Sequence, residues 1–106
     1  MVKEISVSEL KAAIDGKEDI QIIDVREQAE YNAAQIGGTL IPLATLPNHV
    51  NEISKEKKVI VHCRSGKRSE NAIRFLESNF GFTNLYNLKG GILAWKAEID
   101  NSLDVA

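Results

Sequence analysis

The stretch VIVHCRSGKRSENAIRFL, residues 59–76, joins a strand to a helix through a short cationic loop. Residues 58–62, KVIVH, contain three β-branched residues in a row, which is typical of a buried central strand. Beyond the loop, apolar residues recur at helical spacing, so we expect a helix that begins near Arg68 and ends at Gly81; they are Ala72, Ile73, Leu76 and Phe80. A strand followed directly by a helix is the repeating unit of an α/β domain.

The rest of the chain alternates in the same way. Ser6 and Glu9 form a capping box that begins a short helix, which we expect to end near Gly16. Further strands are expected at residues 20–24, 39–43 and 83–88, and helices or helix-compatible segments at residues 25–34, 44–53 and 90–99. The sequence therefore predicts one α/β domain over residues 1–106 with a mainly parallel sheet. The polar tail from about residue 100 is expected to fray.

Charge and hydropathy limit the classes of partner. The chain has 13 basic and 15 acidic residues, a balance that does not favour nucleic-acid binding. Residues 57–74 nevertheless carry six basic residues and one acidic residue, a local positive patch that suits a small anion or an acidic protein face. No apolar run approaches the length of a membrane span, and the N-terminus is too charged for a signal peptide. We therefore expect a cytoplasmic location and neither nucleic acid nor membrane as a partner.

Cys63, the only cysteine, lies between the predicted central strand and the helix. Ligands of open α/β sheets bind at this carboxyl end of a strand. Gly66 lets the loop turn its N–H groups inward, and the helix N-terminus adds a partial positive charge. With the neighbouring cations, these features lower a thiol pKa, so we expect Cys63 to be a thiolate at neutral pH. The alternative is an inert buried thiol.

Two chemistries fit a thiolate in an anion-binding loop. Phosphoryl transfer by a C-x5-R loop requires an arginine six places after the cysteine, but Ser69 stands there and Arg68 comes one place early. The shorter loop better suits a sulfur atom than a tetrahedral phosphate. In sulfur transfer, the thiolate attacks the outer sulfur of an anionic donor such as thiosulfate, and the loop N–H groups stabilise the persulfide that remains. No Cys/His cluster has the spacing of a zinc site, and this chemistry requires no metal or organic cofactor.

Three stretches of the chain resemble the single-domain rhodanese (thiosulfate sulfurtransferase-like) family. They are IDVREQAEYNAAQIGGTLIPL at residues 23–43, VIVHCRSGKRS at 59–69 and NLKGGILAWK at 87–96. The resemblance implies a three-layer fold with a five-stranded parallel sheet and helices on both faces. It also implies that Cys63 is the persulfide-forming nucleophile and that the loop backbone is its cradle, formed by Arg64, Ser65, Gly66, Lys67 and Arg68.

Asp24 and Arg26 match family positions beside this loop. They either support the loop or bind substrate, or they form an ion pair at the strand end. Arg64 and Lys67 either face the substrate or are solvated loop charges. His62 is expected to point away from Cys63, which favours a packed histidine over a general base.

The resulting hypothesis is a sulfurtransferase that moves sulfane sulfur from a small anionic donor to a cellular thiol or a sulfur-carrier protein through Cys63. The alternative is a module that binds or senses sulfide or persulfide and turns over little.

Overall fold

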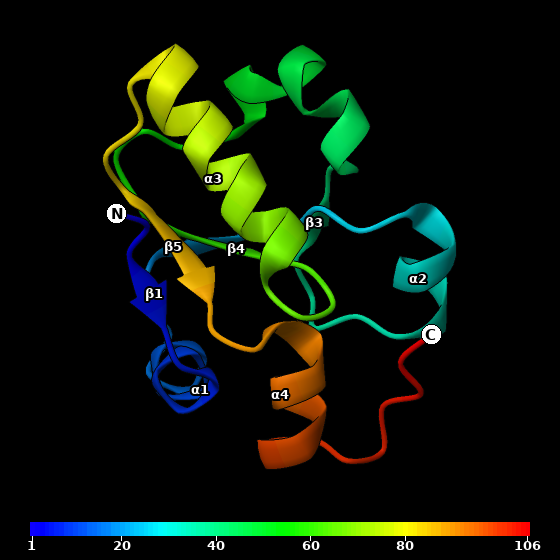
Figure 1. Cartoon of the computed structure of the whole chain (residues 1–106). Helices are drawn as coiled ribbons and strands as arrows, with labels where there is room; N and C mark the ends of the chain where they lie inside the picture. Colours follow the sequence, from blue (N-terminus) through cyan, green and yellow to red (C-terminus); the bar gives the residue numbers. More distant parts are fainter.

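The computed structural model describes residues 1–106 and confirms an α/β domain built on a five-stranded parallel sheet (Figure 1). The strand order is β1-β5-β4-β2-β3, so β4 is the central strand, as the sequence predicts. The elements are β1 (Glu4–Ile5), α1 (Val7–Asp15), β2 (Ile20–Asp24), α2 (Gln28–Ala33), β3 (Thr39–Leu40), the 3-10 helices η1 (Leu43–Asn48) and η2 (Val50–Glu52), β4 (Lys58–His62), α3 (Lys67–Phe80), β5 (Leu85–Leu88) and α4 (Gly91–Glu98).

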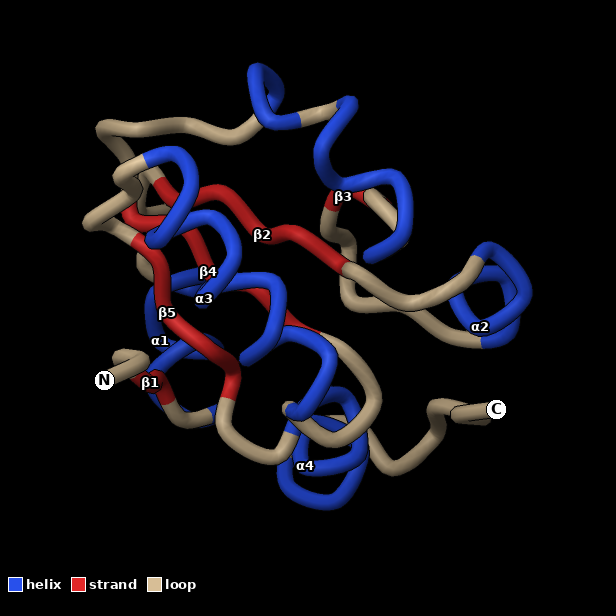
Figure 2. The backbone as a smooth tube through the Cα atoms, turned by 45° about the horizontal axis from the view of Figure 1, so that its top comes forward, coloured by secondary structure: helices blue, strands red, loops and turns tan.

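Two hydrophobic clusters hold helices against the two faces of the sheet. On one face, α3 buries Ala72, Ile73 and Leu76 against residues of β2, β4 and β5. On the other, α1 and α4 contribute Leu10 and Trp95 to a cluster that includes Ile60 of β4. The turned view in Figure 2 places η1 and η2 at the opposite end of the molecule from α4. The three layers follow from the two-residue alternation of each strand, which gives β4 one apolar side for each face.

The sequence signals at the helix ends are confirmed. Ser6 Oγ accepts a hydrogen bond from the N–H of Glu9 at 3.1 Å, and the Glu9 carboxylate accepts one from the N–H of Ser6 at 2.9 Å. Helix α3 begins at Lys67, one residue before the expected start, and ends before Gly81. Gly81 has a φ of 70°, a left-handed conformation that ends helices and that glycine adopts without strain.

Residues 39–53 form less regular structure than the residues around them. The strand β3 is only two residues long, and Pro42, which lacks an N–H group, follows it closely. The segment that was expected to be a loop or a helix forms η1 and η2, with Leu46 and Ile53 buried in the core beneath α3. The 3-10 geometry of η1 is consistent with Pro47 inside it.

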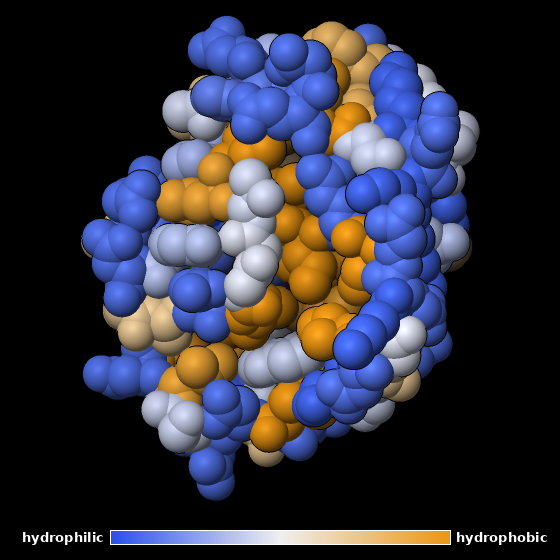
Figure 3. All heavy atoms as spheres, turned by 180° about the vertical axis from the view of Figure 1, so that it is seen from behind, coloured by the Kyte–Doolittle hydropathy of each residue, from blue (hydrophilic) through white to orange (hydrophobic).

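The face of the sheet that α1 and α4 cover is less completely buried than the face that α3 covers. Ile20, Ile22 and Ile36 pack against its cluster but remain partly exposed. Seen from behind, hydrophobic residues reach the surface in a band between hydrophilic ones (Figure 3). After α4 the chain has no helix or strand; Leu103 packs against the cluster, and the end of the chain lies near α2 (Figure 1). No helix has both the length and the apolar character that crossing a membrane requires.

Candidate active site

Cys63 follows the last residue of β4 and lies beneath the first turn of α3. Two residues earlier, Val61 belongs to the core on the α3 face, and the strand alternation places Cys63 on the same face. Only 1% of Cys63 is exposed. The loop that carries it lies between the beginnings of α3 and α4 (Figure 1). The position at the carboxyl end of the central strand is the one that the sequence predicts.

Three hydrogen-bond donors of the loop and the start of α3 lie within hydrogen-bond distance of the Cys63 sulfur. The N–H of Gly66 lies 3.1 Å from Sγ, the N–H of Ser69 lies at 3.4 Å, and the Ser69 hydroxyl at 3.3 Å. Gly66 has a φ of 110°, a conformation that side chains disfavour, and this turns its N–H toward the sulfur. The geometry is that of an anion cradle centred on one atom.

These hydrogen bonds set the acidity of the thiol. Burial raises the pKa of Cys63, because a buried thiolate loses its hydration. The hydroxyl and N–H of Ser69 and the N–H groups of Gly66 and Ser65 lower it, and together they outweigh burial. The net result is a Cys63 pKa below its ordinary value. The causes are neutral hydrogen-bond donors around the sulfur.

The cationic side chains of the loop lie around the cradle without contacting the sulfur. Arg64 is exposed, and its Nε donates to the carbonyl oxygen of Ala106 at 3.0 Å. Ser65 and Lys67 are also exposed and line an open cavity of about 280 Å³ beside the loop. The other lining residues are Glu4, Gly66, Glu70, Asn87 and Gly90. No hydrophobic residue lines this cavity, which opens to solvent beside the cradle.

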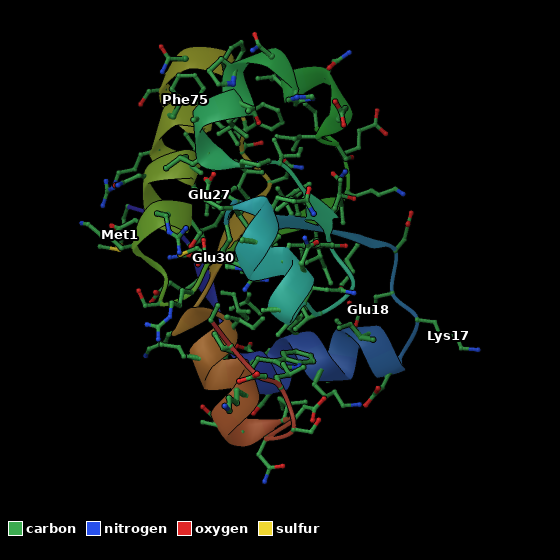
Figure 4. All side chains as sticks on the ribbon, turned by 90° about the vertical axis from the view of Figure 1, so that its right-hand side faces the viewer. Met1, Lys17, Glu18, Glu27, Glu30 and Phe75 are labelled. Atoms are coloured by element: carbon green, nitrogen blue, oxygen red, sulfur yellow. The ribbon has the colours of Figure 1, made fainter.

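Arg68 differs from the other loop cations because a carboxylate binds it. Its two terminal nitrogens donate to Glu30 of α2 at 2.7 and 2.9 Å. Figure 4 shows Glu30 on the side of α2 that faces α3. The hydrogen bonds from Arg68 lower the pKa of Glu30 to about 2 and raise that of Arg68. The Arg68 side chain therefore ties α2 to the start of α3.

Asp24 and Arg26 form a buried ion pair at the end of β2. Both side chains are fully buried, and the Arg26 guanidinium donates to both carboxylate oxygens of Asp24 at 2.7 to 3.1 Å. Arg26 also donates to the carbonyl oxygens of Ala34, at 2.7 Å, and Glu30, at 3.4 Å. These contacts orient the segment that carries Glu30. The structure thus brings Arg26 close to the loop through α2, and not to Cys63 itself.

His62 lies on the opposite face of β4 from Cys63. Its Nε2 is 3.7 Å from Asp24, and its Nδ1 is 3.4 Å from the carbonyl oxygen of Cys63. Burial lowers the pKa of His62, so the ring is neutral. This geometry matches the packed histidine that the strand alternation predicts.

Sequence reasoning missed three residues that build the site: Ser69, Asn87 and Glu30. The Ser69 hydroxyl lies 2.6 Å from Asn87 Oδ1, and Asn87 Nδ2 donates to the carbonyl oxygen of Gly66 at 3.0 Å. A signal for Asn87 was available, because an amide among the apolar residues of a predicted buried strand requires hydrogen-bond partners.

The start of α4 fixes the loop from the other side. The N–H groups of Ile92 and Leu93 donate to the carbonyl oxygens of Cys63 and Arg64 at 3.0 and 3.1 Å. A Cβ on Gly91, whose φ is 61°, would lie 2.5 Å from the Arg64 carbonyl oxygen. The KGG turn therefore lets α4 approach the loop backbone closely.

Comparisons with known proteins agree with this architecture. The family described as Rhodanese-like domain matches residues 6–98. A sulfurtransferase of Allochromatium vinosum is 36% identical over 90% of this chain and 89% of its own length. A thiosulfate sulfurtransferase of Coxiella burnetii is 38% identical over 76% of each chain.

The solved structures include a rhodanese-like domain protein from Staphylococcus aureus. It superposes with a TM-score of 0.83 at 32% identity and covers 99% of both chains. The sequence match, the parallel sheet and the loop after its central strand lead to one conclusion: this chain belongs to the rhodanese-like family, whose relatives include sulfurtransferases.

Proposed function

We propose that this protein is a sulfurtransferase that carries sulfane sulfur on Cys63 as a persulfide. The observation that carries the proposal is the surroundings of the Cys63 sulfur, which lies within hydrogen-bond distance of Gly66 N–H, Ser69 N–H and the Ser69 hydroxyl. A buried atom surrounded by converging donors is suited to bear negative charge. The lowered pKa of Cys63 increases the fraction of the residue that is present as a thiolate at a given pH.

The proposed reaction has two half-reactions. The Cys63 thiolate attacks the outer sulfur of thiosulfate; a new S–S bond forms, the S–S bond of thiosulfate breaks, and sulfite leaves with the bonding electron pair. A thiophilic acceptor, either a small thiol or a sulfur-carrier protein, then attacks the terminal sulfur and regenerates the Cys63 thiolate. This is nucleophilic catalysis with a ping-pong order.

Part of the cradle is free to hold the added sulfur. The N–H groups of Lys67 and Arg68 belong to the first turn of α3, where no carbonyl of the same helix can accept from them. The positive end of the helix dipole lies at the same place. These groups are the proposed donors to the terminal persulfide sulfur, while Arg64 and Lys67 attract the anionic donor from solution.

The burial of Cys63 favours a second candidate, a module that binds or senses persulfide and turns over slowly. With 1% of the residue exposed, a large acceptor has limited access to the sulfur. Steady-state turnover separates the two functions. An enzyme continues to release sulfite while thiosulfate and a thiol acceptor are present, whereas a binding module loads once and stops.

Intact-mass measurement before and after brief exposure to thiosulfate tests the proposal. Wild type is expected to gain the mass of one sulfur atom and to lose it on treatment with cyanide, and Cys63→Ala is expected to gain nothing. Absence of the added mass on folded, reduced wild type would exclude thiosulfate as the donor. The same added mass on Cys63→Ala would exclude Cys63 as the carrier.

A further inference from the structure

Asn87 is a buried polar residue beside the cradle that the proposed mechanism does not use. It pairs in register with Val61, two residues before Cys63, because β5 lies next to β4 (Figure 1). It is 4% exposed. Leu85, the other residue of β5 on this face, is apolar. The Asn87 amide lies beneath the first turn of α3, where its Oδ1 contacts Ser69 beside the sulfur.

Both ends of the Asn87 amide are engaged. Its nitrogen donates to the Gly66 carbonyl oxygen, which fixes the orientation of the amide because a carbonyl can only accept. Oδ1 therefore faces the Ser69 hydroxyl at 2.6 Å. Oδ1 has no hydrogen to give, so the Ser69 hydroxyl is the donor in this contact.

The Ser69 hydroxyl also lies 3.3 Å from the Cys63 sulfur, and it has only one hydrogen. When that hydrogen points to Asn87, the Ser69 hydroxyl has none left to donate to the sulfur. Its oxygen can then interact with Cys63 only as an acceptor, from the S–H of the protonated thiol. When the thiol has lost its proton to solvent, the hydroxyl can stabilise the sulfur only by turning away from Asn87. Asn87 and the sulfur anion therefore compete for one hydrogen.

We propose that Asn87 is a positioning residue that holds the Ser69 hydroxyl while Cys63 is a thiol and releases it to the sulfur when the sulfur becomes an anion. Releasing the hydroxyl leaves the buried Oδ1 of Asn87 without a donor, which costs free energy. Asn87 thus limits how far the donors of the cradle can lower the pKa of Cys63. The limit is useful because the nucleophilicity of a thiolate falls as its pKa falls.

The charged groups that surround the site stay constant when only Asn87 changes. They come from the loop and α3, from β1, from α2 and from the opposite face of the sheet: Arg64, Lys67, Arg68, Glu70, Glu4, Glu30, His62, Asp24 and Arg26. A difference between variants at Asn87 therefore reports on the hydroxyl and not on these charges.

The test is the pH profile of Cys63 alkylation by iodoacetamide in Asn87→Leu, which is similar in shape and has neither donor nor acceptor. With the sulfur as the only acceptor left to Ser69, the midpoint is expected to move to lower pH. Below the midpoint, alkylation should be about tenfold faster, the gain expected when a buried acceptor no longer competes. A merely structural role predicts the opposite, because a loosened cradle raises the midpoint. Asn87→Ala is measured beside it, in case leucine prevents folding.

Two further variants complete the experiment. In a Ser69→Ala background, Asn87→Leu is expected to leave the profile unchanged, because the competing hydroxyl is gone. Asn84→Leu is the matched control: its amide donates to the carbonyl oxygens of Ser54 and Lys57 at the other end of β5, so it should lower stability without moving the midpoint. An unchanged or raised midpoint in the Asn87 variants, or an equal shift in the Ser69→Ala background, overturns the proposal.

The inference rests on the proposed function only in taking Cys63 as the nucleophile. Alkylation requires no sulfur donor, so the role of Asn87 and the proposed sulfur transfer can be refuted independently. A shifted profile in a protein that does not gain sulfur would refute the transfer and keep the role of Asn87. An unshifted profile in a protein that gains sulfur would refute the role of Asn87 and keep the transfer.

Discussion

The ends of β2 and β4 are adjacent, yet they use their polar groups in different ways. Asp24 and His62 are the last residues of the two strands and pair in register. Beyond β2, Asp24 and Arg26 neutralise each other in full burial. Beyond β4, uncharged N–H and O–H groups converge on the sulfur of Cys63.

The difference separates two uses of a buried polar group. At the end of β2, the charged groups of Asp24 and Arg26 bind each other, and Arg26 also donates to the backbone carbonyl oxygens of Glu30 and Ala34, so this ion pair stabilises the position of α2. The N–H groups of Gly66 and Ser69 after β4 point at the sulfur, and the Ser69 hydroxyl is shared between the sulfur and Asn87, so these donors are suited to a charge that appears on the sulfur during reaction. Under the proposed function, formal charge is a poor guide to which strand end is reactive, whereas convergence of hydrogen-bond donors is a good one.

The largest expected effect is the loss of sulfur transfer in Cys63→Ser. Transfer should fall by at least about a thousandfold, because a hydroxyl of much higher pKa replaces the nucleophile. The free energy of unfolding should change by less than about 1 kcal/mol, since the serine oxygen can accept from the same donors. Sulfite release and thermal unfolding measure the two effects. Retained transfer would remove Cys63 from the mechanism.

Arg26→Met tests the other strand end and should affect stability most. It leaves the Asp24 carboxylate buried without its partner, at a cost of about 3–5 kcal/mol. The double variant Asp24→Asn, Arg26→Met carries no lone charge and should recover part of the loss. Urea unfolding of the three proteins measures this. If the single variant unfolds within about 1 kcal/mol of wild type, the ion pair does not stabilise this strand end as we describe.

A smaller effect is expected from Glu30→Gln, which weakens the link between the two regions. Arg68 holds the pKa of Glu30 at about 2, below that of a carboxyl in the unfolded chain. A depressed pKa contributes stability that is fully present above the unfolded value and is lost as the pH falls toward 2. The melting temperature of the variant should therefore lie below that of wild type at pH 7, and the gap should close between about pH 4.5 and pH 2. A gap independent of pH would assign the loss to packing.

Most helices and strands of this fold could be predicted from local pattern, but the two-residue strand β1, which forms by pairing with β5, was not predicted, and β3 is shorter than expected. The capping box at Ser6, the β-branched run before Cys63 and Gly81 each act within a few residues of chain, so the sequence carries them directly. The loop around Cys63 could be predicted for the same reason. Its N–H groups depend on the strand, the loop and the helix start, which follow one another without interruption.

The rest of the site depends on contacts between distant parts of the chain. Ser69 and Asn87 are 18 residues apart, and Arg68 and Glu30 are 38 apart. Asn87 meets the cradle because β5 pairs with β4 in a particular register, which no local pattern specifies. For the same reason, the burial of Arg26 and the engagement of Arg68 by Glu30 became visible only in the folded chain.

The hydrogen bonds from the start of α4 to the loop backbone also have a consequence for protein synthesis. The ribosome adds residues from the N-terminus, so Cys63 and Arg64 are made well before Ile92 and Leu93, whose N–H groups bind their carbonyl oxygens. A nascent chain that ends before residue 92 lacks both tethers. The loop backbone at Cys63 and Arg64 therefore gains its support from α4 only after Ile92 and Leu93 have been synthesised and α4 has packed against the loop.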